Sequence, residues 1–316
     1  MSPFNPLLQG MLSLHQTYQS FELYLTPLNN SVMQMISMTR NQDSYSPKPE
    51  EVIEHYASGY EADRLHREAG QLEGERTREL LGRFLPLPPA TVLDVGGGAG
   101  SYALWLARQG YEVHLIDIVP LHIQLAQEAS ARQPEAQLAS ANVGDACSLS
   151  WDAETVDSVM LLGPLYHLTD RSDRLKALQE AYRVLKPGGV LLAVGISRFA
   201  STLDGLRSGF LKDPQFAEIV SKDLESGQHR NPTGRPEYFM DTFFHRPDEL
   251  NSELTEVSFT VTGIYGVEGP GWLLSDFDAG WRDRDFQARL LQIARRLETE
   301  PSLLGVSAHL LAVATK

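Results

Sequence analysis

The sequence has 316 residues, of which 42% are hydrophobic and 22% charged, and its formal net charge is −14. These proportions are typical of globular proteins, and the length suits one large α/β domain with additions or two small domains. An acidic surface repels phosphate backbones and no cluster of Lys and Arg offsets it, so nucleic acid is not expected as a substrate. No stretch of about 18 apolar residues occurs, which argues against a membrane span.

The number of cysteines and the composition of the N-terminus indicate the cellular compartment in which the protein is expected. Cys147 is the single cysteine in the sequence, so no internal disulfide can form and a reducing, cytoplasmic location is expected. The N-terminus has no basic region, and Glu22 interrupts its apolar stretch, so it does not resemble a signal peptide.

Residues 1–46 are predicted to be an N-terminal extension, rich in Leu, Met, Ser, Gln and Asn. Their apolar spacing favours helices over residues 7–25 and 32–38. Two interpretations stay open. The extension is either poorly ordered, or a helical arm that covers the active site or a partner subunit of a homodimer.

Residues 47–90 are predicted to form a helical cap. Charged residues alternate with apolar ones at helical spacing from Glu50 to Leu85, and a proline-rich segment at 86–89 ends the pattern.

Residues 91–316 are predicted to form the main domain. Strand and helix patterns alternate up to residue 195, which implies a parallel sheet with right-handed crossovers and helices on both faces. The expected strands cover residues 91–95, 111–116, 137–141, 156–162 and 190–195, and the expected helices cover 101–109, 121–132 and 171–184. A turn at Lys186-Pro187-Gly188-Gly189 is expected before the last of these strands.

Residues 197–246 break this alternation and are predicted to be an inserted lid. They contain a helical stretch at 214–224, followed by Gly, Pro and aromatic residues. Beyond the lid, helices are expected at 248–254 and 283–298, and apolar runs at 259–265 and 304–314 are expected to add strands at the sheet edge.

A glycine-rich turn follows the first expected strand, in Val-Leu-Asp-Val-Gly-Gly-Gly-Ala-Gly from Val92 to Gly100. Glycine lets the backbone bend sharply and approach a ligand more closely than any Cβ would allow. The helix that follows presents free backbone N–H groups. Several classes of nucleotide-binding protein share such a turn, so it does not identify the ligand alone.

Three features narrow the choice of ligand. The spacing is Asp-x-Gly-x-Gly-x-Gly, with Asp94 inside the strand end, whereas a dinucleotide fingerprint would need glycine at Ser101. Asp117 ends the second strand, where a carboxylate can accept both hydroxyls of a ribose. Asp145 follows the third strand, where an acid can accept a hydrogen bond from an adenine amino group. Asp94 and Asp117 each have a structural alternative as turn acids.

Together these motifs resemble the class I S-adenosylmethionine-dependent methyltransferases over roughly residues 50–316. The resemblance implies a Rossmann-like, mostly parallel sheet of seven strands whose last strand is antiparallel, with S-adenosyl-L-methionine as the cofactor. The cofactor-binding residues that it implies are Tyr60, Asp94, Gly96, Gly98, Gly100, Asp117, Ile118, Asp145, Ala146, Leu162 and Gly163. For Tyr60, packing between the cap helices is an equal alternative.

Methyl transfer from a sulfonium is an in-line displacement that requires alignment and exclusion of water but no metal, and no metal ligands are expected. The acceptor should lie at the carboxyl ends of the first and fourth strands. Tyr166 and His167 follow the fourth strand, and His167 is the candidate for a catalytic base or for a residue that orients the acceptor. Capping or packing of the next helix is the alternative for His167.

Further aromatic residues are predicted to line the acceptor pocket. They are Tyr56 in the cap, Tyr238, Phe243 and His245 in the lid, and Trp272. His245 has an alternative role just before a helix that begins near Pro247, and Trp272 has an alternative role in the core.

The leading hypothesis is an enzyme that methylates O, N, S or C of a small organic acceptor, with secondary metabolism as its setting. One alternative is an NAD-linked oxidoreductase. Ser101 argues against it, because the dinucleotide fingerprint requires glycine at that position. Another is a non-catalytic binding protein on the same scaffold, against which the intact cofactor motifs speak.

Overall fold

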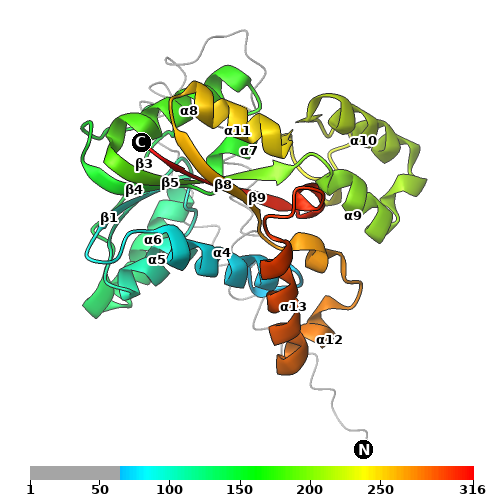
Figure 1. Ribbon diagram of the computed structural model, residues 1–316, viewed down its shortest axis with the longest axis horizontal. Helices are drawn as coiled ribbons and strands as arrows, with labels where there is room; N and C mark the ends of the chain where they lie inside the picture. The colour runs from blue at the N-terminus through cyan, green and yellow to red at the C-terminus, as the bar shows by residue number, and fades with distance from the viewer. Residues whose placement is uncertain (1–64) are drawn as a thin grey trace, which may run out of the picture. The chain divides into compact units, whose positions relative to one another are not determined.

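A mixed sheet of nine strands organises residues 65–316, the part of the chain that this computed structural model describes (Figure 1). The described residues belong to the second of two units, which spans residues 45–316. The helices expected at 7–25 and 32–38, and the predicted site residues Tyr56 and Tyr60, lie outside the described residues.

The strands are β1 (Thr91–Val95), β2 (Glu112–Asp117), β3 (Ser140–Val143), β4 (Val156–Leu161), β5 (Leu185–Ser197), β6 (Gln228–His229), β7 (Thr242–His245), β8 (Thr260–Gly266) and β9 (His309–Thr315). The α-helices are α4 (Gly70–Phe84), α5 (Ser101–Arg108), α6 (Pro120–Ala131), α7 (Pro164–His167), α8 (Arg171–Val184), α9 (Ala200–Ser208), α10 (Pro214–Ser226), α11 (Pro247–Glu256), α12 (Phe277–Arg282) and α13 (Arg284–Leu297). A 3₁₀-helix, η5 (Gly269–Leu273), follows β8.

Seven of the nine strands form the predicted arrangement, a mostly parallel sheet with an antiparallel last strand. β3, β2, β1, β4 and β5 lie side by side in that order and are all parallel. β9 pairs with the other edge of β5, and β8 pairs with β9; both of these pairings are antiparallel.

The strand expected at 304–314 was placed too early, because residues 304–306 form a 3₁₀ turn and β9 begins only at His309. The predicted turn at residues 186–189 falls within β5, where the pairing with β4 passes from Leu185 directly to Val190, so these four residues bulge out of the β4 ladder. The N–H of Gly188 donates to the carbonyl of Lys316, and the N–H of Lys316 donates to the carbonyl of Gly189. This pairing keeps the segment in the sheet even though Gly188 has a φ of +76°.

Two strands within the predicted lid were not expected. β7 pairs in parallel with the last residues of β5, with Ile196 opposite Phe244 and Ser197 opposite His245, and β6 pairs with β7. Residues 242–245 are therefore part of the sheet. Their pattern, Thr-Phe-Phe-His, is too short to show a strand period in a Gly- and Pro-rich stretch.

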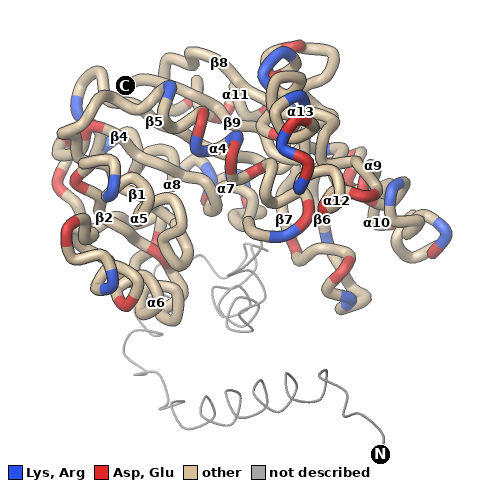
Figure 2. Tube along the Cα trace, turned by 90° about the horizontal axis from the view of Figure 1, so that it is seen from below, with Lys and Arg blue, Asp and Glu red and all other residues tan. Residues whose placement is uncertain are grey.

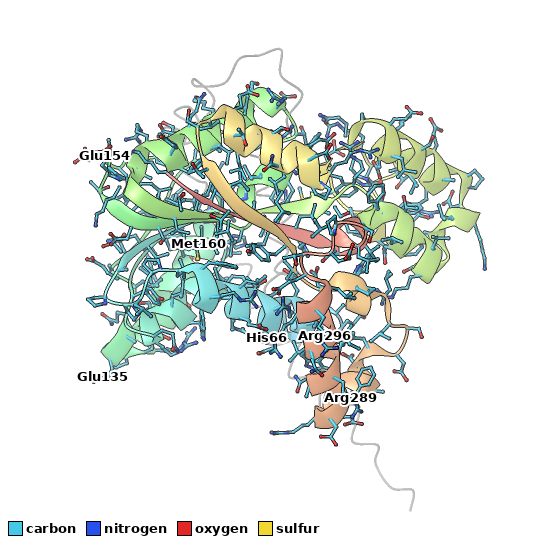
Figure 3. All side chains as sticks on the ribbon, viewed as in Figure 1. His66, Glu135, Glu154, Met160, Arg289 and Arg296 are labelled. Atoms are coloured by element: carbon cyan, nitrogen blue, oxygen red, sulfur yellow. The ribbon has the colours of Figure 1, made fainter. Side chains whose placement is uncertain are left out.

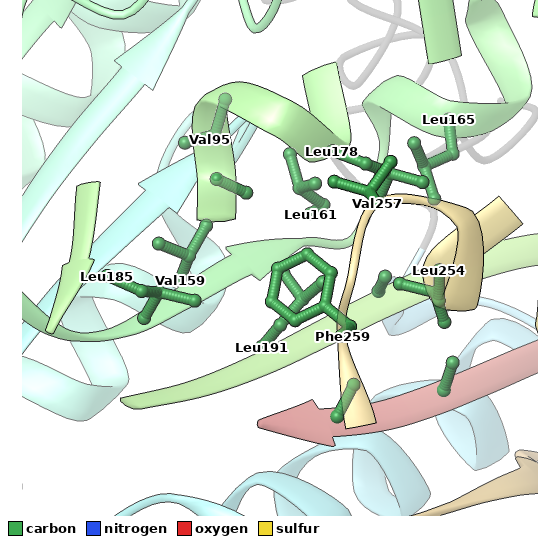
Figure 4. Close-up of a cluster of buried hydrophobic side chains, with 14 of the residues drawn as sticks. Val95, Val159, Leu161, Leu165, Leu178, Leu185, Leu191, Leu254, Val257 and Phe259 are labelled. Carbon is green, nitrogen blue, oxygen red and sulfur yellow. The ribbon is translucent and has the colours of Figure 1, made fainter. Parts of the chain in front are cut away.

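Strand alternation divides the core between the two faces of the sheet. Leu93, Val159 and Leu191 point to the face covered by α8 and α11, where Phe259 completes a fully apolar cluster (Figure 4). The side chains at the alternate strand positions point to the other face, where they contact α4, α5 and α6 (Figure 1). Among them is Met160, which Figure 3 labels within the sheet and which is fully buried. Each fully buried Leu or Met contributes about 1.5–3 kcal/mol relative to an exposed one.

Local sequence explains where several helices begin. α6 begins at Pro120 and α11 at Pro247, a residue that fits the first helical turn because it has no N–H to satisfy. Asp213 and Asp283 accept backbone N–H groups at the starts of α10 and α13. α13 carries Arg289 and Arg296, both exposed (Figure 3). None of the helices in the described residues has the length and apolar character that crossing a bilayer requires.

Candidate functional site

The carboxyl ends of β1, β2 and β3 bring the three predicted acids to one edge of the sheet. Asp94 lies opposite Leu115 of β2, and Asp117 lies opposite Val143 of β3, two residues before Asp145. The N–H of Gly144 donates to the carbonyl of Asp117 over 3.0 Å, which ties the loop after β3 to the end of β2. The acids therefore follow three neighbouring strands.

Asp94 is a buried carboxylate without a hydrogen-bond partner among the described residues. Its side chain is 1% exposed, and neither oxygen accepts a hydrogen bond. Burial, and in second place the nearby charge of Asp117, raise the pKa of Asp94 to about 8. The alternative role as a turn acid would need a hydrogen bond that neither oxygen makes. Because an unpaired buried polar group is costly, Asp94 points to a missing cationic or donor partner.

The glycine turn beside Asp94 leaves room for a ligand at one position. At Gly96, with a φ of +72°, an added Cβ would lie 2.6 Å from Cγ of Pro164, so the turn packs closely against the start of α7. At Gly98, with a φ of +59°, the nearest atom to an added Cβ is Nδ1 of His122, 4.0 Å away. The open space next to Gly98 fits close approach of a ligand to the backbone.

Asp117 holds this turn in place. Its Oδ2 atom accepts the N–H of Gly98 over 2.8 Å, and its Oδ1 atom accepts the N–H of Val119 over 2.8 Å. Nδ1 of His122, in the first turn of α6, lies 3.1 Å from the same Oδ1 atom. Each carboxylate oxygen has two lone pairs, so Oδ2 keeps one acceptor position for a ribose hydroxyl. Ribose binding by Asp117 stays a prediction.

His122 is a residue of this site that the sequence reasoning missed. It lies five positions after Asp117, in the first turn of the next helix. The helix that follows the ribose acid returns to the sheet edge at its N-terminus, so its first turn can face that acid. The signal that the sequence offered for His122 was a polar side chain five residues after Asp117, in the first turn of the following helix.

The loop after β3 is braced by its own acid. Oδ1 of Asp145 accepts the N–H of Cys147 over 2.9 Å. Ile118 and Ala146 are half-buried beside the two strand ends. Their contacts with an adenine stay predictions.

The end of β4 contacts the glycine turn. An added Cβ at Gly163 would lie 3.0 Å from the carbonyl oxygen of Gly96, so the two segments touch. Leu162 and Gly163 are half-buried. The rings of Tyr166 and His167 lie in α7 directly after them, with 4.7 Å between the ring centroids. The structure thus brings Tyr166 and His167 to the same edge as the proposed cofactor residues.

The predicted acceptor residues of the lid have partners within the fold. Tyr238 donates its hydroxyl to Oδ2 of Asp213 over 2.9 Å. The ring of Phe243 lies under the guanidinium of Arg174, 3.6 Å from its centroid. Their contact with an acceptor stays a prediction.

His245 and Trp272 are also buried and bonded. His245 is fully buried in β7, just before the helix that begins at Pro247, and its Nε2 atom lies 3.3 Å from Oε2 of Glu253. Burial lowers the pKa of His245, which keeps its ring neutral in the core. Trp272 donates its Nε1–H to the carbonyl of Val306 over 2.8 Å. Acceptor binding by either residue stays a prediction.

Comparison with known proteins bears on this edge of the sheet. Residues 93–193, which run from β1 into β5, match a family model described as a methyltransferase domain. The chain is 31% identical over 156 residues to a ubiquinone/menaquinone biosynthesis C-methyltransferase of Acidiphilium cryptum, covering 48% of this chain and 61% of that one. It is 38% identical over 106 residues to an erythromycin 3''-O-methyltransferase of Saccharopolyspora erythraea, covering 33% of each. This chain therefore spans less than two thirds of the length of these relatives.

A solved structure shows the same fold. The S-adenosylmethionine-dependent methyltransferase of Methanosarcina mazei aligns with a TM-score of 0.50 and 24% identity, over 75% of this chain and 96% of that one. The matched residues carry the glycine turn, Asp94, Asp117, Asp145 and the end of β4. Residues 93–193 therefore match a methyltransferase domain, and the sheet that they form has the fold of a solved S-adenosylmethionine-dependent methyltransferase.

Proposed function

We propose that this chain transfers a methyl group from S-adenosyl-L-methionine to O, N, S or C of a small organic acceptor. When bound, the cofactor supplies an electrophilic methyl group on a positively charged sulfur. The observation that carries the proposal is the buried carboxyl group of Asp94, which has no hydrogen-bond partner within residues 65–316 and lies in the same turn as Gly98. A ligand that brings an ammonium group to this position would satisfy Asp94 and remove the cost of its burial.

The other residues of the edge are proposed to hold the adenosyl part. Asp117 would accept a ribose hydroxyl at Oδ2 while its other contacts keep the turn at Gly98 in place. Asp145 and the backbone of Ala146 would read the adenine edge, and Ile118 would flank the ring. Leu162 and Gly163 would border the cofactor where β4 meets the glycine turn.

The acceptor is proposed to bind where β4 continues into α7, beside Tyr166 and His167. His167 would accept a proton at a ring nitrogen when the acceptor is a phenol or an amine, and would otherwise orient the acceptor. The relatives named above are, by their names, methyltransferases of ubiquinone/menaquinone biosynthesis and of erythromycin, which supports a small organic acceptor.

A small molecule is proposed as acceptor instead of nucleic acid because the net charge is −14 and basic residues are interspersed with acidic ones along the described chain (Figure 2). A cytoplasmic location, expected from the sequence, belongs to the same proposal, as does the homodimer that one of the two interpretations of residues 1–46 includes.

Calorimetric titration tests the cofactor assignment. The full chain should bind S-adenosylmethionine and S-adenosylhomocysteine and should not bind NADH. Asp117→Ala and Asp94→Asn should each weaken that binding, whereas Asp248→Asn, an exposed acid in the first turn of α11, should leave it unchanged. Binding of NADH with no response to either adenosyl compound would overturn the proposal.

A metabolite panel with a radiolabelled methyl donor would then identify the acceptor. With that acceptor, His167→Ala should lower kcat while the affinity for the cofactor stays the same. An unchanged kcat would remove His167 as the base.

A further inference from the structure

A second group of polar side chains lies outside the proposed cofactor residues. Glu73 of α4, Glu268 before η5 and His309 at the start of β9 each offer one ligand atom, and these atoms all lie within 4.8 Å of one another. Nδ1 of His309 lies 2.5 Å from Oε1 of Glu268 and 3.8 Å from Oε2 of Glu73. Both carboxylates are buried, and the imidazole is half-buried.

The fold fixes the orientation of Glu268. Its Oε2 atom accepts the hydroxyl of Ser307 over 2.7 Å and the N–H of His309 over 3.1 Å. The Ser307 hydroxyl in turn accepts the N–H of Glu268 over 3.0 Å. These contacts leave Oε1 as the oxygen directed toward His309. Hydrogen bonds of this kind, to the far oxygen of a carboxylate, orient ligands in protein metal sites.

The backbone of His309 is fixed as well. It is the first residue of β9 and pairs with Ile196 of β5. Because β9 is antiparallel to β5, its first residue lies at the carboxyl end of β5, the same sheet edge that carries the cofactor residues. Three segments far apart in the sequence therefore meet at a place set by the sheet.

We propose that Glu73, Glu268 and His309 bind one divalent first-row transition metal ion. Carboxylate oxygens together with an imidazole nitrogen form a mixed O/N ligand set, which favours such an ion over Mg²⁺ or Ca²⁺. Ligand atoms about 2.0–2.2 Å from a tetrahedral ion lie roughly 3.4 Å from one another. The 3.8 Å separation fits this value, and the 2.5 Å separation would widen by about 1 Å on binding.

Three protein ligands leave a coordination position for an exchangeable oxygen. β9 is two strand positions from β4 in the sheet, and His309 lies opposite Ile196, three residues beyond the β5 partner of Leu161, which places His309 about 14 Å from the end of β4. An acceptor would have to extend over that distance to reach both sites. A role for the ion in holding an oxygen of the acceptor rests on the proposed function, but metal binding itself does not.

Electron paramagnetic resonance of Mn²⁺ tests the site without any acceptor or cofactor. The full chain, freed of metal by a chelating resin, should bind one Mn²⁺, and Zn²⁺ should displace it while Mg²⁺ should not. Glu73→Gln and His309→Gln should each weaken Mn²⁺ affinity at least tenfold. Glu75→Gln is the matched control, because Glu75 lies on the same helix and pairs with Arg78 instead.

Two results would overturn the metal site. One is the absence of Mn²⁺ and Zn²⁺ binding by the wild-type chain. The other is equal affinity in all the variants. Should a variant fail to fold by circular dichroism, pulsed resonance on the wild type decides, because the bound Mn²⁺ must show coupling to an imidazole nitrogen. Calorimetry with S-adenosylmethionine fails or succeeds independently of these measurements.

Discussion

Nδ1 of His122 lies 3.1 Å from Oδ1 of Asp117, whose other oxygen accepts the N–H of Gly98. The imidazole therefore braces the acid that holds the glycine turn. His122→Ala should weaken S-adenosylmethionine binding about fivefold, the value of one hydrogen bond of about 1 kcal/mol. His122→Asn, which can still donate to the carboxylate, should recover part of the affinity. Calorimetric titration measures both, and full affinity in the alanine variant would contradict the bracing role.

Comparing Gly98→Ala with Gly188→Ala should separate the effect of backbone strain on stability from the effect of lost ligand space on cofactor affinity. Gly98 has a φ of +59°, and open space adjoins the position of an added Cβ. Gly188 has a φ of +76°, equally open surroundings and a position at the amino end of β5. Both alanine variants should lose about 1 kcal/mol of stability through strain. Only Gly98→Ala should also weaken cofactor binding, and an equal loss of affinity in both variants would contradict this.

Asp94 should release a proton when the cofactor binds. With a pKa of about 8, raised by burial and by Asp117, roughly nine-tenths of this carboxyl is protonated at pH 7. Pairing with an ammonium group requires the carboxylate. Titrations at pH 7 in two buffers of different ionisation enthalpy should therefore report release of close to one proton per cofactor. The release should fall at pH 9 and be absent in Asp94→Asn.

The same carboxyl should make the stability of the cofactor-free chain depend on pH. The pKa of Asp94 is higher in the folded chain than its ordinary value of 3.8, so the folded state retains a proton that the unfolded state loses. Its contribution to stability therefore falls as pH rises from about 4 to 8 and is constant above that range. Asp94→Asn should be more stable than the wild type by a margin that grows over this interval. Thermal unfolding at several pH values measures that margin.

Glu253→Gln should destabilise the junction of α8, α11 and β7. Glu253 accepts hydrogen bonds from the buried Arg174 over 2.8–3.1 Å and contacts His245 over 3.3 Å. Removing its charge leaves a buried guanidinium without a counterion, at a cost of about 3–5 kcal/mol. Urea unfolding at pH 7 measures the loss. Glu256→Gln, which removes an exposed partner of Arg171 on the same helix, should change stability little.

Lowering the pH should reduce the difference in the free energy of unfolding between Glu253→Gln and the wild type. Burial raises the pKa of Glu253, but the hydrogen bonds from His245 and Arg174 outweigh burial and lower it to about 2. The stabilisation is therefore complete above pH 4.5 and is lost as pH falls toward 2. A difference that stays constant down to pH 2 would contradict the assignment of the charge to Glu253.

The central part of the fold was predictable because each signal there is local. A strand such as Thr91–Val95 is an apolar run that ends at a glycine turn, and α8 is a helical pattern that ends before Leu185. The family resemblance supplied the seven-stranded, mostly parallel sheet and its antiparallel last strand, β9. The acids Asp94, Asp117 and Asp145 were found because strand ends in a parallel sheet share one edge.

What the sequence did not reveal depends on contacts between distant segments. β7 becomes a strand only because β5 extends beyond the end of β4 and exposes an edge there. Glu73, Glu268 and His309 are brought together by α4 and β9, and no spacing in the sequence links them. His245 was predicted either to bind the acceptor or to precede the helix at Pro247, and its fully buried position beside Glu253 follows from the pairing of β7, which the sequence did not show. Such placements need the sheet to be known first.

β5 also determines how the inserted segment can move. Its residue Ile196 pairs with His309 on one edge and with Phe244 on the other, and the side chain of Arg198 bonds both the carbonyl of Phe244 and the carboxylate of Glu249. Swinging α9 and α10 outward as a rigid flap would have to break this main-chain ladder and a buried guanidinium contact together. Entry and exit of an acceptor would therefore proceed through motions that leave residues 242–245 anchored, with the hinges placed within the helical part of the insertion.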